Sequence, residues 1–326
     1  MISDYILDFL SVTQKAAFAS YSFAGRGNSK EADRIAVETM RSAINQISAT
    51  VSVVIGEGER DKAPMLYIGE RLGNGGLELD LAVDPLEGTD ICADFREGAI
   101  SVLGFGGSGS ILCAPDVYME KIYTPYECEV SFENTVAQNL KSIASAKGVE
   151  SAAKLIITVL KRERNQQLIE DIRKAGAKVR LITDGDISAI VSIILKGETD
   201  AYMGSGGAPE GVLSAIAVRN LGGTMIGKLL LQDNERREYA RKLGILDLEK
   251  SYTHYEMVRG EAIFIATGVT NGKLLAGIDD RDSSTIASCE SLVILPGAFH
   301  KLQSSFHRSG KIQPTCLQGY PDRVSN

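Results

Sequence analysis

The feature that most constrains the fold is a regular alternation of helix-like and strand-like segments in the second half of the chain. Parallel strands need a crossover connection between them, and that connection is usually a helix. The alternation therefore predicts parallel βαβ units and places the chain in the α/β class. The predicted segments, helix first and then strand in turn, are 134–147, 155–160, 165–175, 179–183, 187–195, 201–203, 209–220 and 224–231.

The chain before residue 134 is richer in strand signals. It opens with two predicted helices, at 4–20 and 30–49, and Asn28 or Ser29 can cap the second because a side-chain oxygen there accepts from free amides. The change of pattern, in a chain of 326 residues, predicts two domains, 1–140 and 141–326. We expect the last ~20 residues, rich in Gly, Pro and Ser, to be loop. The early strands are predicted at 51–55, 77–83, 100–105 and 120–123, with Asp84-Pro85 ending the second.

Composition excludes several classes of partner and site. With 35 Lys+Arg against 42 Asp+Glu, the net charge is −7, so the clustered basic surface of a nucleic-acid or anionic-membrane binder is not expected. Five scattered cysteines with no CxxC pair suit free thiols in a reducing cytoplasm. Three histidines without an HExxH motif disfavour a His-liganded zinc site. The N-terminus lacks a signal-peptide pattern, and no apolar run approaches ~18 residues.

Two glycine-rich segments match nucleotide-binding patterns only superficially. Residues 104–109 fit GxGxxG, but the β-like segment after them ends at Pro115, whereas a dinucleotide site needs a helix there. Residues 222–228 fit GxxxxGK, but Leu229 follows in place of the Ser or Thr that binds magnesium in a P-loop. We interpret the first as a turn between strands and the second as a helix end leading into a strand.

The informative chemistry lies in two acidic segments that each follow a predicted strand. GEGERD occupies 56–61 and DPLEGTD occupies 84–90. Loops at strand ends of an α/β sheet form ligand sites, and hard cations such as Mg²⁺ and Mn²⁺ prefer carboxylate and carbonyl oxygens. Asp84 and Glu87 can therefore point at one ion, and Glu57 could complete a second site. The plainer interpretation is that acids and glycines simply form turns here, which fits either segment alone better than both together.

A third segment, 204–211, opens the predicted helix at 209–220 and supplies Glu210. Pro209 suits the first helical position. Glu210 could ligate a metal, or it could simply complement the helix dipole. Thr89 or Asp90, at the end of the second acidic segment, could cap a following helix whose free amides would receive phosphate.

GEGERD, DPLEGTD and GGAPEG, in this order, resemble the class II fructose-1,6-bisphosphatases of the lithium-sensitive phosphatase superfamily. The resemblance covers nearly the whole chain, and the absence of Trp separates it from the inositol monophosphatases, whose third motif usually reads WDxAAG. It implies an α/β/α/β/α layered sandwich and a hydrolase that uses Mn²⁺ or Mg²⁺. It promotes Asp33, which spacing alone would leave as a solvated helix residue. The implied metal ligands are Asp33, Glu57, Asp84, Glu87 and Glu210.

A bisphosphate needs a second anion site, and basic residues at 161–164 follow a predicted strand, where Arg can grip phosphate with two hydrogen bonds. The alternative there is an exposed charge run. Acids at 184–186 end the next strand and could accept from sugar hydroxyls or cap a helix. Whether Arg162 or Arg164 meets the phosphate stays open. With the tyrosine that the resemblance adds, the predicted substrate-binding residues are Glu87, Gly88, Thr89, Tyr118, Arg162, Arg164, Asp184, Gly185, Asp186 and Gly207.

The resulting hypothesis is metal-dependent hydrolysis of the 1-phosphate of fructose 1,6-bisphosphate to fructose 6-phosphate and phosphate, a gluconeogenic reaction. Thr89, Asp84 and Glu57 are the predicted catalytic residues, with Thr89 orienting the attacking water. Sedoheptulose 1,7-bisphosphate is an alternative or additional substrate. A silent sugar-phosphate-binding protein and a nucleotide-dependent oxidoreductase are more distant alternatives. The resemblance also implies a homodimer or homotetramer.

Overall fold

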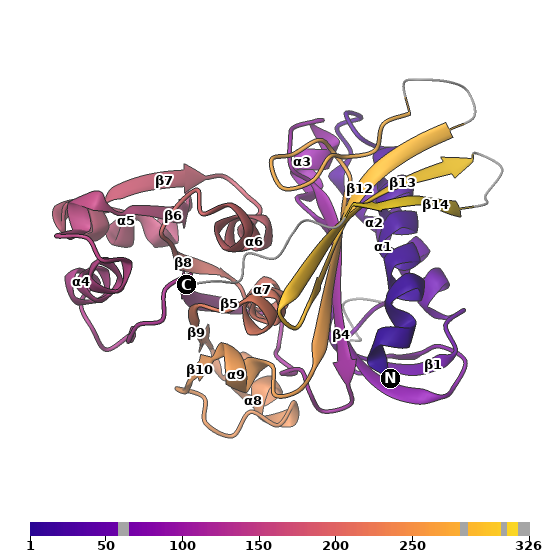
Figure 1. The fold of residues 1–326 in the computed structure, drawn as a ribbon. Helices are drawn as coiled ribbons and strands as arrows, with labels where there is room; N and C mark the ends of the chain where they lie inside the picture. The colour runs from indigo at the N-terminus through magenta and orange to yellow at the C-terminus, as the bar shows by residue number, and fades with distance from the viewer. Residues whose placement is uncertain (58–64, 281–285, 308–311, 319–326) are drawn as a thin grey trace. The chain divides into compact units, whose positions relative to one another are not determined.

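The computed structural model describes residues 1–57, 65–280, 286–307 and 312–318 (Figure 1). The chain forms two compact units. Unit 1 comprises Met1–Ile111 and Gly260–Asn326, and unit 2 comprises Leu112–Arg259. Unit 2 is therefore a continuous segment placed within the sequence of unit 1. The α/β class expected from the sequence is confirmed, because each unit combines one sheet with packed helices.

Unit 1 contains an eight-stranded sheet in the order β14-β13-β12-β11-β4-β3-β1-β2. Only β1 and β3 pair in parallel, and every other neighbouring pair is antiparallel. Helices α1 (Ile6–Tyr21) and α2 (Ser29–Ile44) pack on this sheet (Figure 1). The strands are β1 (Ala49–Ile55), β2 (Arg71–Leu72), β3 (Leu77–Glu87), β4 (Ile100–Gly107), β11 (Ala262–Gly268), β12 (Ile286–Leu295), β13 (Ala298–His307) and β14 (Ile312–Gln318).

The core of unit 1 forms where the apolar faces of α1 and α2 meet alternate residues of the strands. Phe9 of α1 stacks on Phe105 of β4, with ring centroids 4.1 Å apart. Asn28 caps α2, its side chain accepting from the Glu31 amide at 3.1 Å, so one of the two caps proposed from the sequence is confirmed. Val37, Met40 and Ile44 of α2 lie buried in the same core, so α2, which carries Asp33, packs against the sheet.

Strand β3 continues past the Asp84-Pro85 pair that was expected to end it. Its register against β4 shifts there: Asp84 lies opposite Val102, but Glu87 lies opposite Ile100. Three residues on β3 thus match two on β4, which is a β-bulge. Because Pro85 has no amide hydrogen to donate, it is tolerated at such an irregularity. The expectation of a strand end at this proline was wrong.

Unit 2 contains a six-stranded sheet in the order β10-β9-β5-β8-β6-β7. Its strands are β5 (Tyr118–Thr124), β6 (Ile156–Leu160), β7 (Lys178–Ile182), β8 (Ala201–Gly207), β9 (Thr224–Leu230) and β10 (Ser251–Thr253). Its helices are α4 (Val136–Lys147), α5 (Gln166–Lys174), α6 (Asp186–Lys196), α7 (Ala208–Leu221), α8 (Asn234–Lys242) and α9 (His254–Met257). Helices α4 and α5 cover one face of the sheet, and α6 and α7 cover the other (Figure 1).

The predicted βαβ alternation is confirmed with one modification. Strand β6 pairs in parallel with both β7 and β8. Strand β5 lies between β8 and β9 and is antiparallel to both. Strands β8 and β9 therefore run in the same direction but do not pair with each other. Strand β5, which comes earlier in the chain, therefore lies among the parallel strands β6 to β9. Local periodicity does not reveal this position.

The division of the chain differs from the expected 1–140 and 141–326. The chain passes from unit 1 to unit 2 between residues 111 and 112 and returns to unit 1 between 259 and 260. It returns because β11 pairs with β4, from Ala262↔Gly106 to Gly268↔Ile100. Pairing of segments so far apart in sequence leaves no mark in composition. The last segment, expected as loop, contributes β14 to the edge of the sheet.

The two glycine-rich segments, 104–109 and 222–228, have the structures predicted for them. Strand β4 runs through Gly107 and a turn follows without a helix, while Gly222 ends α7 and Thr224 begins β9. Cys92, Cys128 and Cys289 are free thiols. Within the described ranges, no helix has both the length and the apolarity that a membrane crossing requires.

Candidate functional site

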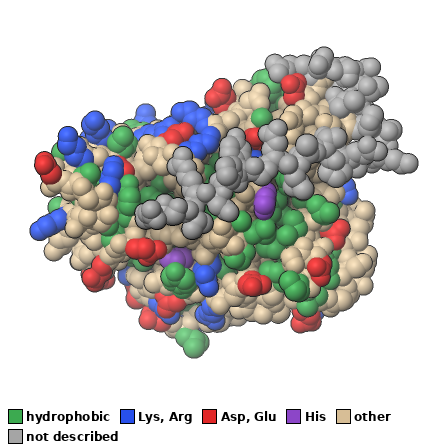
Figure 2. Space-filling view, viewed as in Figure 1, with side chains coloured by type: hydrophobic (Ala, Val, Ile, Leu, Met, Phe, Trp, Pro, Cys, Tyr) green, Lys and Arg blue, Asp and Glu red, His purple; other side chains and the backbone are tan. Residues whose placement is uncertain are grey.

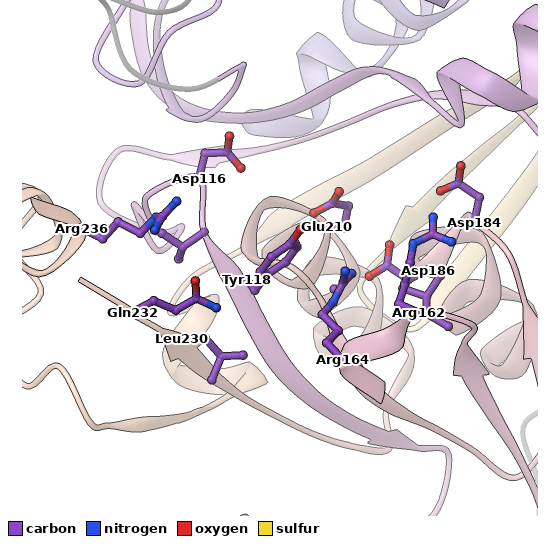
Figure 3. Close-up of a pocket in the computed structure, with 14 residues that line it drawn as sticks. Asp116, Tyr118, Arg162, Arg164, Asp184, Asp186, Glu210, Leu230, Gln232 and Arg236 are labelled. Atoms are coloured by element: carbon purple, nitrogen blue, oxygen red, sulfur yellow. The ribbon is translucent and has the colours of Figure 1, made fainter. Parts of the chain in front are cut away.

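A cavity of about 440 Å³ opens in unit 2 at the edge where β6, β7 and β8 end. The carboxyl ends of these parallel strands meet there, and α6 and α7 begin there, which is the usual position of a ligand site in an α/β sheet. Of the residues predicted from the sequence to bind substrate or metal, seven line this cavity (Figure 3): Tyr118, Arg162, Arg164, Asp184, Asp186, Gly207 and Glu210.

Arg164 is the better fixed of the two candidate phosphate-binding arginines. Its guanidinium carbon lies 4.1 Å from the centre of the Tyr118 ring, and its Nε donates to the Ser205 carbonyl at 3.1 Å. The buried Asn165 side chain also bonds Ser205, accepting from its amide at 2.8 Å. Both arginines are exposed, but the Arg162 side chain bonds only the Lys161 carbonyl among the described residues, at 3.3 Å.

Lys and Arg side chains gather over the region of α5 and β7 (Figure 2). Lys161 is exposed directly after β6, at the edge where the cavity opens, whereas Lys174 and Lys178 lie at the other end of β7. Beside the cavity the positive charge is that of Lys161, Arg162 and Arg164. A positive field near a cavity raises the local concentration of anionic ligands. The cavity therefore suits a phosphorylated molecule, although the chain as a whole is acidic.

The acidic side of the cavity is built by the loop that enters α6. Gly185 adopts φ +79°, a left-handed conformation that favours glycine, and its amide donates to Asp184 Oδ1 at 3.1 Å. Asp186 follows as the first residue of α6, is buried, and forms an ion pair with Lys121. Asp184 faces the cavity (Figure 3), where a carboxylate can accept from a hydroxyl.

Glu210 lies in the first turn of α7, and its carboxylate is the most perturbed in the cavity. Its Oε2 is inaccessible to solvent and has no hydrogen-bond partner in the described structure. Burial, with the Asp186 carboxylate nearby, raises the pKa of Glu210 to about 7, and the Lys121 ammonium opposes the shift. A buried oxygen without a donor is costly, so this atom fits a cation ligand.

In unit 1, the bulge in β3 brings two predicted metal ligands to one face of the sheet. Side chains alternate along a regular strand, so residues three apart would point to opposite faces. Asp84 and Glu87 instead lie opposite Val102 and Ile100, which are two apart on β4 and share a face. The extra residue therefore aligns both carboxylates, as shared coordination of one ion requires.

The turn after β3 differs slightly from expectation. Gly88, at φ +85°, is the residue before helix α3 (Thr89–Ala93), and Thr89 is the first residue within that helix. Thr89 therefore does not cap the helix, as one interpretation proposed. The helix is only five residues long. Its hydroxyl-bearing first residue follows directly after Glu87 and Gly88.

Asp33 lies on α2, half-buried, and burial raises the pKa of its carboxyl. Its carboxylate forms no hydrogen bond or ion pair within the described residues, which fits a group that awaits a cation. Glu57 stands directly before residues 58–64, and 58–61 of the GEGERD motif lie outside the described residues. No three His, Cys, Asp or Glu side chains within the described ranges are grouped so as to hold a metal ion.

Some cavity residues were missed by the sequence argument. Asp116, Gln232 and Arg236 line the end of the cavity away from Arg162 (Figure 3) and belong to no motif. Lys121, below the cavity, had a detectable signal. On strand β5, Lys121 lies two residues after Met119 and so faces the same buried side of the sheet. A charged side chain on a buried face needs a partner.

The arginine-lined cavity of unit 2, with a buried Glu210 oxygen that has no hydrogen-bond partner among the described residues, suits a phosphorylated ligand and a cation. The family model described as bacterial fructose-1,6-bisphosphatase, glpX-encoded, matches residues 3–301. The chain belongs to this family. Family membership also implies dependence on a divalent metal, which the Asp33 and Glu210 carboxylates fit.

Curated relatives agree with this assignment. The chain is 40% identical over 317 residues to the "D-fructose 1,6-bisphosphatase class 2/sedoheptulose 1,7-bisphosphatase" of Synechococcus elongatus, covering 88% of this chain and 91% of the relative. It is 41% identical over 317 residues to the "D-fructose 1,6-bisphosphatase class 2/sedoheptulose 1,7-bisphosphatase 2" of Acaryochloris marina, covering 88% and 90%. Among solved structures, inositol monophosphatase from Anabaena matches with a TM-score of 0.34 and 14% identity over 62% of this chain and 74% of that one, and we draw nothing from so distant a likeness.

Proposed function

We propose that the protein hydrolyses the 1-phosphate of fructose 1,6-bisphosphate, using Mg²⁺ or Mn²⁺, and releases fructose 6-phosphate and phosphate. The observation that carries the proposal is the cavity of unit 2. Arg162 and Arg164 offer charge to a phosphate group that is held, while the buried Glu210 carboxylate offers a cation ligand for a phosphate that reacts. A substrate with two phosphates uses both features.

The proposed metal ligands are Asp33, Glu57, Asp84, Glu87 and Glu210. A divalent cation held by carboxylates neutralises phosphate oxygens and lowers the pKa of a bound water. The bulge in β3 presents Asp84 and Glu87 together. The Thr89 hydroxyl then holds the attacking water in line with the phosphorus, a positioning role that suits a neutral side chain.

The proposed substrate contacts of unit 2 divide the sugar phosphate among three groups. Arg164 binds the 6-phosphate, because Tyr118 and the Ser205 carbonyl already fix its orientation and leave less entropy to lose on binding. Arg162 adds charge nearby. The carboxylates of Asp184 and Asp186 accept from sugar hydroxyls. The backbone at Gly185 and Gly207 can approach the ligand closely, since neither residue carries a side chain, and Gly88 in unit 1 is a further proposed contact.

Sedoheptulose 1,7-bisphosphate is a second candidate substrate. Both named relatives carry that activity in their names. The cavity also extends to Asp116, Gln232 and Arg236, beyond the groups used above (Figure 3). That additional polar lining can accommodate one more hydroxylated carbon.

The test is a phosphate-release assay on both bisphosphates, with inositol 1-phosphate as a third compound, in Mg²⁺, Mn²⁺ or excess chelator. We expect release from fructose 1,6-bisphosphate only when metal is present. Binding of the sugar phosphate without any release would instead identify a silent binding protein. Release from inositol 1-phosphate alone would contradict the substrate assignment.

We also propose a homodimer or homotetramer in the cytoplasm. The free thiols favour a reducing compartment. Light scattering coupled to gel filtration measures the mass of the assembly directly, and a mass of about 35 kDa, that of a single chain, would contradict the oligomer.

A further inference from the structure

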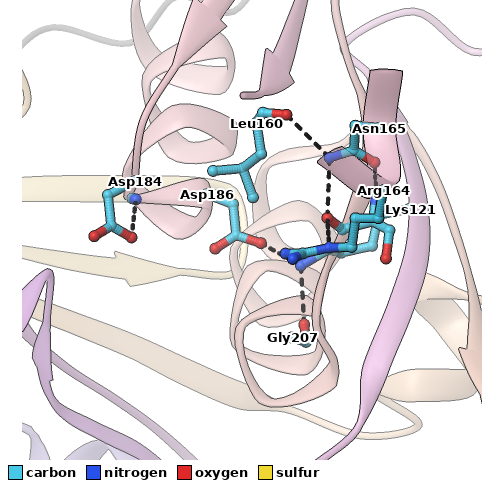
Figure 4. Close-up of polar contacts among 9 residues, drawn as sticks. Lys121, Leu160, Arg164, Asn165, Asp184, Asp186 and Gly207 are labelled. Carbon is cyan, nitrogen blue, oxygen red and sulfur yellow. Dashed lines mark hydrogen bonds and ion pairs between the residues drawn. The ribbon is translucent and has the colours of Figure 1, made fainter. Parts of the chain in front are cut away.

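Lys121 is a fully buried lysine below the floor of the unit 2 cavity. It lies on β5, its side chain has no exposed surface, and it points to the face of the sheet covered by α6 and α7. Its ammonium forms an ion pair with Asp186 and donates to the Gly207 carbonyl at 2.9 Å (Figure 4). Lys121 therefore ties the first residue of α6 to the residue that precedes α7.

The surroundings of Lys121 are built to admit it. A Cβ on Gly206 would lie 2.4 Å from Asp186 Oδ2 and 2.9 Å from Lys121 Nζ, so any side chain there would separate the pair. A Cβ on Gly211 would lie 2.5 Å from Met119 Sδ and 3.2 Å from Lys121 Cδ. Burying an ammonium is costly unless it is paired and hydrogen-bonded. An apolar side chain at this position would fill the same space without oxygen partners. The two oxygen partners and the neighbouring glycines therefore point to a role for the charge of Lys121.

We infer that Lys121 is a positioning residue for the substrate site: it fixes the Asp186 carboxylate and the backbone at Gly207, and thereby sets the geometry of the cavity floor. The inference rests on the proposed function, because Asp186 and Gly207 are proposed substrate contacts. Lys121 itself does not line the cavity. It acts through Asp186, and its positive charge allows the Asp186 and Glu210 carboxylates to lie close together in a buried region.

The test compares Lys121→Met, which keeps the length of the chain but removes the charge, with Lys121→Arg and the unaltered enzyme. Lys178→Met is the control, since Lys178 is an exposed lysine on β7 of the same sheet. We expect Lys121→Met to raise KM for fructose 1,6-bisphosphate, and Kd for fructose 6-phosphate by calorimetry, about tenfold, while kcat changes less than about threefold. Lys121→Arg should recover part of the loss. A folded Lys121→Met with KM and Kd within about twofold of the unaltered enzyme would overturn the inference.

A second comparison works even if Lys121→Met alone fails to fold. Asp186→Asn and the double variant Lys121→Met/Asp186→Asn differ only in Lys121, and the double variant leaves neither charge buried without its partner. If Lys121 acts mainly through Asp186, with the Gly207 contact secondary, these two variants should have Kd values within about twofold of each other. A further tenfold loss in the double variant would contradict the assigned role. Phosphate release by the unaltered enzyme, measured separately, tests the proposed function, whereas the calorimetric comparison requires no turnover.

Discussion

Single carboxylates carry most of the chemistry proposed for this protein, and their surroundings differ sharply. Glu210 has a buried oxygen with no partner, and Asp33 is half-buried without one in the described structure. Asp186 is also buried but has Lys121 beside it. Their positions at predicted strand ends and helix starts suggested Asp186 and Glu210 as site residues, whereas only the family resemblance suggested Asp33. The sequence does not show which of these carboxylates already has an ammonium beside it, because that depends on neighbours from other strands.

Glu210 should make the metal-free protein less stable as pH rises. Its pKa is about 7 in the folded state against an ordinary 4.5, so the folded state binds more protons across that interval. The stability that this proton contributes is present below pH 4.5 and is lost as pH rises towards 7, by on the order of 1–3 kcal/mol. Chemical unfolding of the unaltered protein and Glu210→Gln at pH 5 and pH 7.5 measures the difference. Added Mn²⁺ should stabilise the unaltered protein at pH 7.5 more than it stabilises Glu210→Gln. An identical pH dependence in both proteins would refute this account.

Thr89 should be needed for its hydroxyl and for little else. Thr89→Ser keeps the hydroxyl and should retain part of the activity, whereas Thr89→Ala should lose at least about a hundredfold in kcat, the scale of a group that acts in the transition state. Steady-state phosphate release gives kcat for both variants. Near-normal turnover by Thr89→Ala would exclude a role for Thr89 in catalysis.

At the scale of elements, the site depends on how strands end and helices begin. The bulge in β3 aligns Asp84 with Glu87, and the starts of α6 and α7 carry Asp186 and Glu210. Periodicity located these strands and helices well, because each buries one face. It did not locate the bulge, since Pro85 is as typical of a strand end as of an irregularity within a strand.

Glycine at position 206 should be needed for the pairing of Lys121 with Asp186. In Gly206→Ala the new Cβ would lie 2.4 Å from Asp186 Oδ2, so the variant should lose about 2 kcal/mol of stability through overpacking and should show a raised KM. Gly107→Ala, on β4, has no atom within 4 Å of the new Cβ and should change stability by no more than about 0.5 kcal/mol. Urea unfolding measures both. Equal stability of the two variants would show that the space around Lys121 is not restricted.

At the scale of the whole molecule, a continuous unit 2 is placed within the sequence of unit 1. The class of fold and the family were predictable, because short motifs and alternating segments are local properties. The positions of the junctions were not. They depend on β11 pairing with β4, which joins segments more than 150 residues apart, and on β5 entering a parallel set from outside it. Such pairings are decided by long-range packing.

Unit 2 should fold on its own, because its sheet is covered on both faces by its own helices. A fragment spanning 112–259 should unfold cooperatively on heating and should bind fructose 6-phosphate, since Tyr118, Arg164 and Asp184 all lie within it. It should release no phosphate, because Asp84 and Thr89 are absent. Circular dichroism and calorimetry are the measurements. A fragment that folds but does not bind fructose 6-phosphate would contradict the proposal that the arginine-lined cavity binds the sugar phosphate.

The most direct measurement of the central claim is phosphorus NMR of the reaction on fructose 1,6-bisphosphate. With Mg²⁺ or Mn²⁺ present, the account predicts that the 1-phosphate signal disappears while fructose 6-phosphate and inorganic phosphate appear in equal amounts. With excess chelator, the spectrum should not change. Accumulation of fructose 1-phosphate, or no hydrolysis in the presence of either metal, would contradict it.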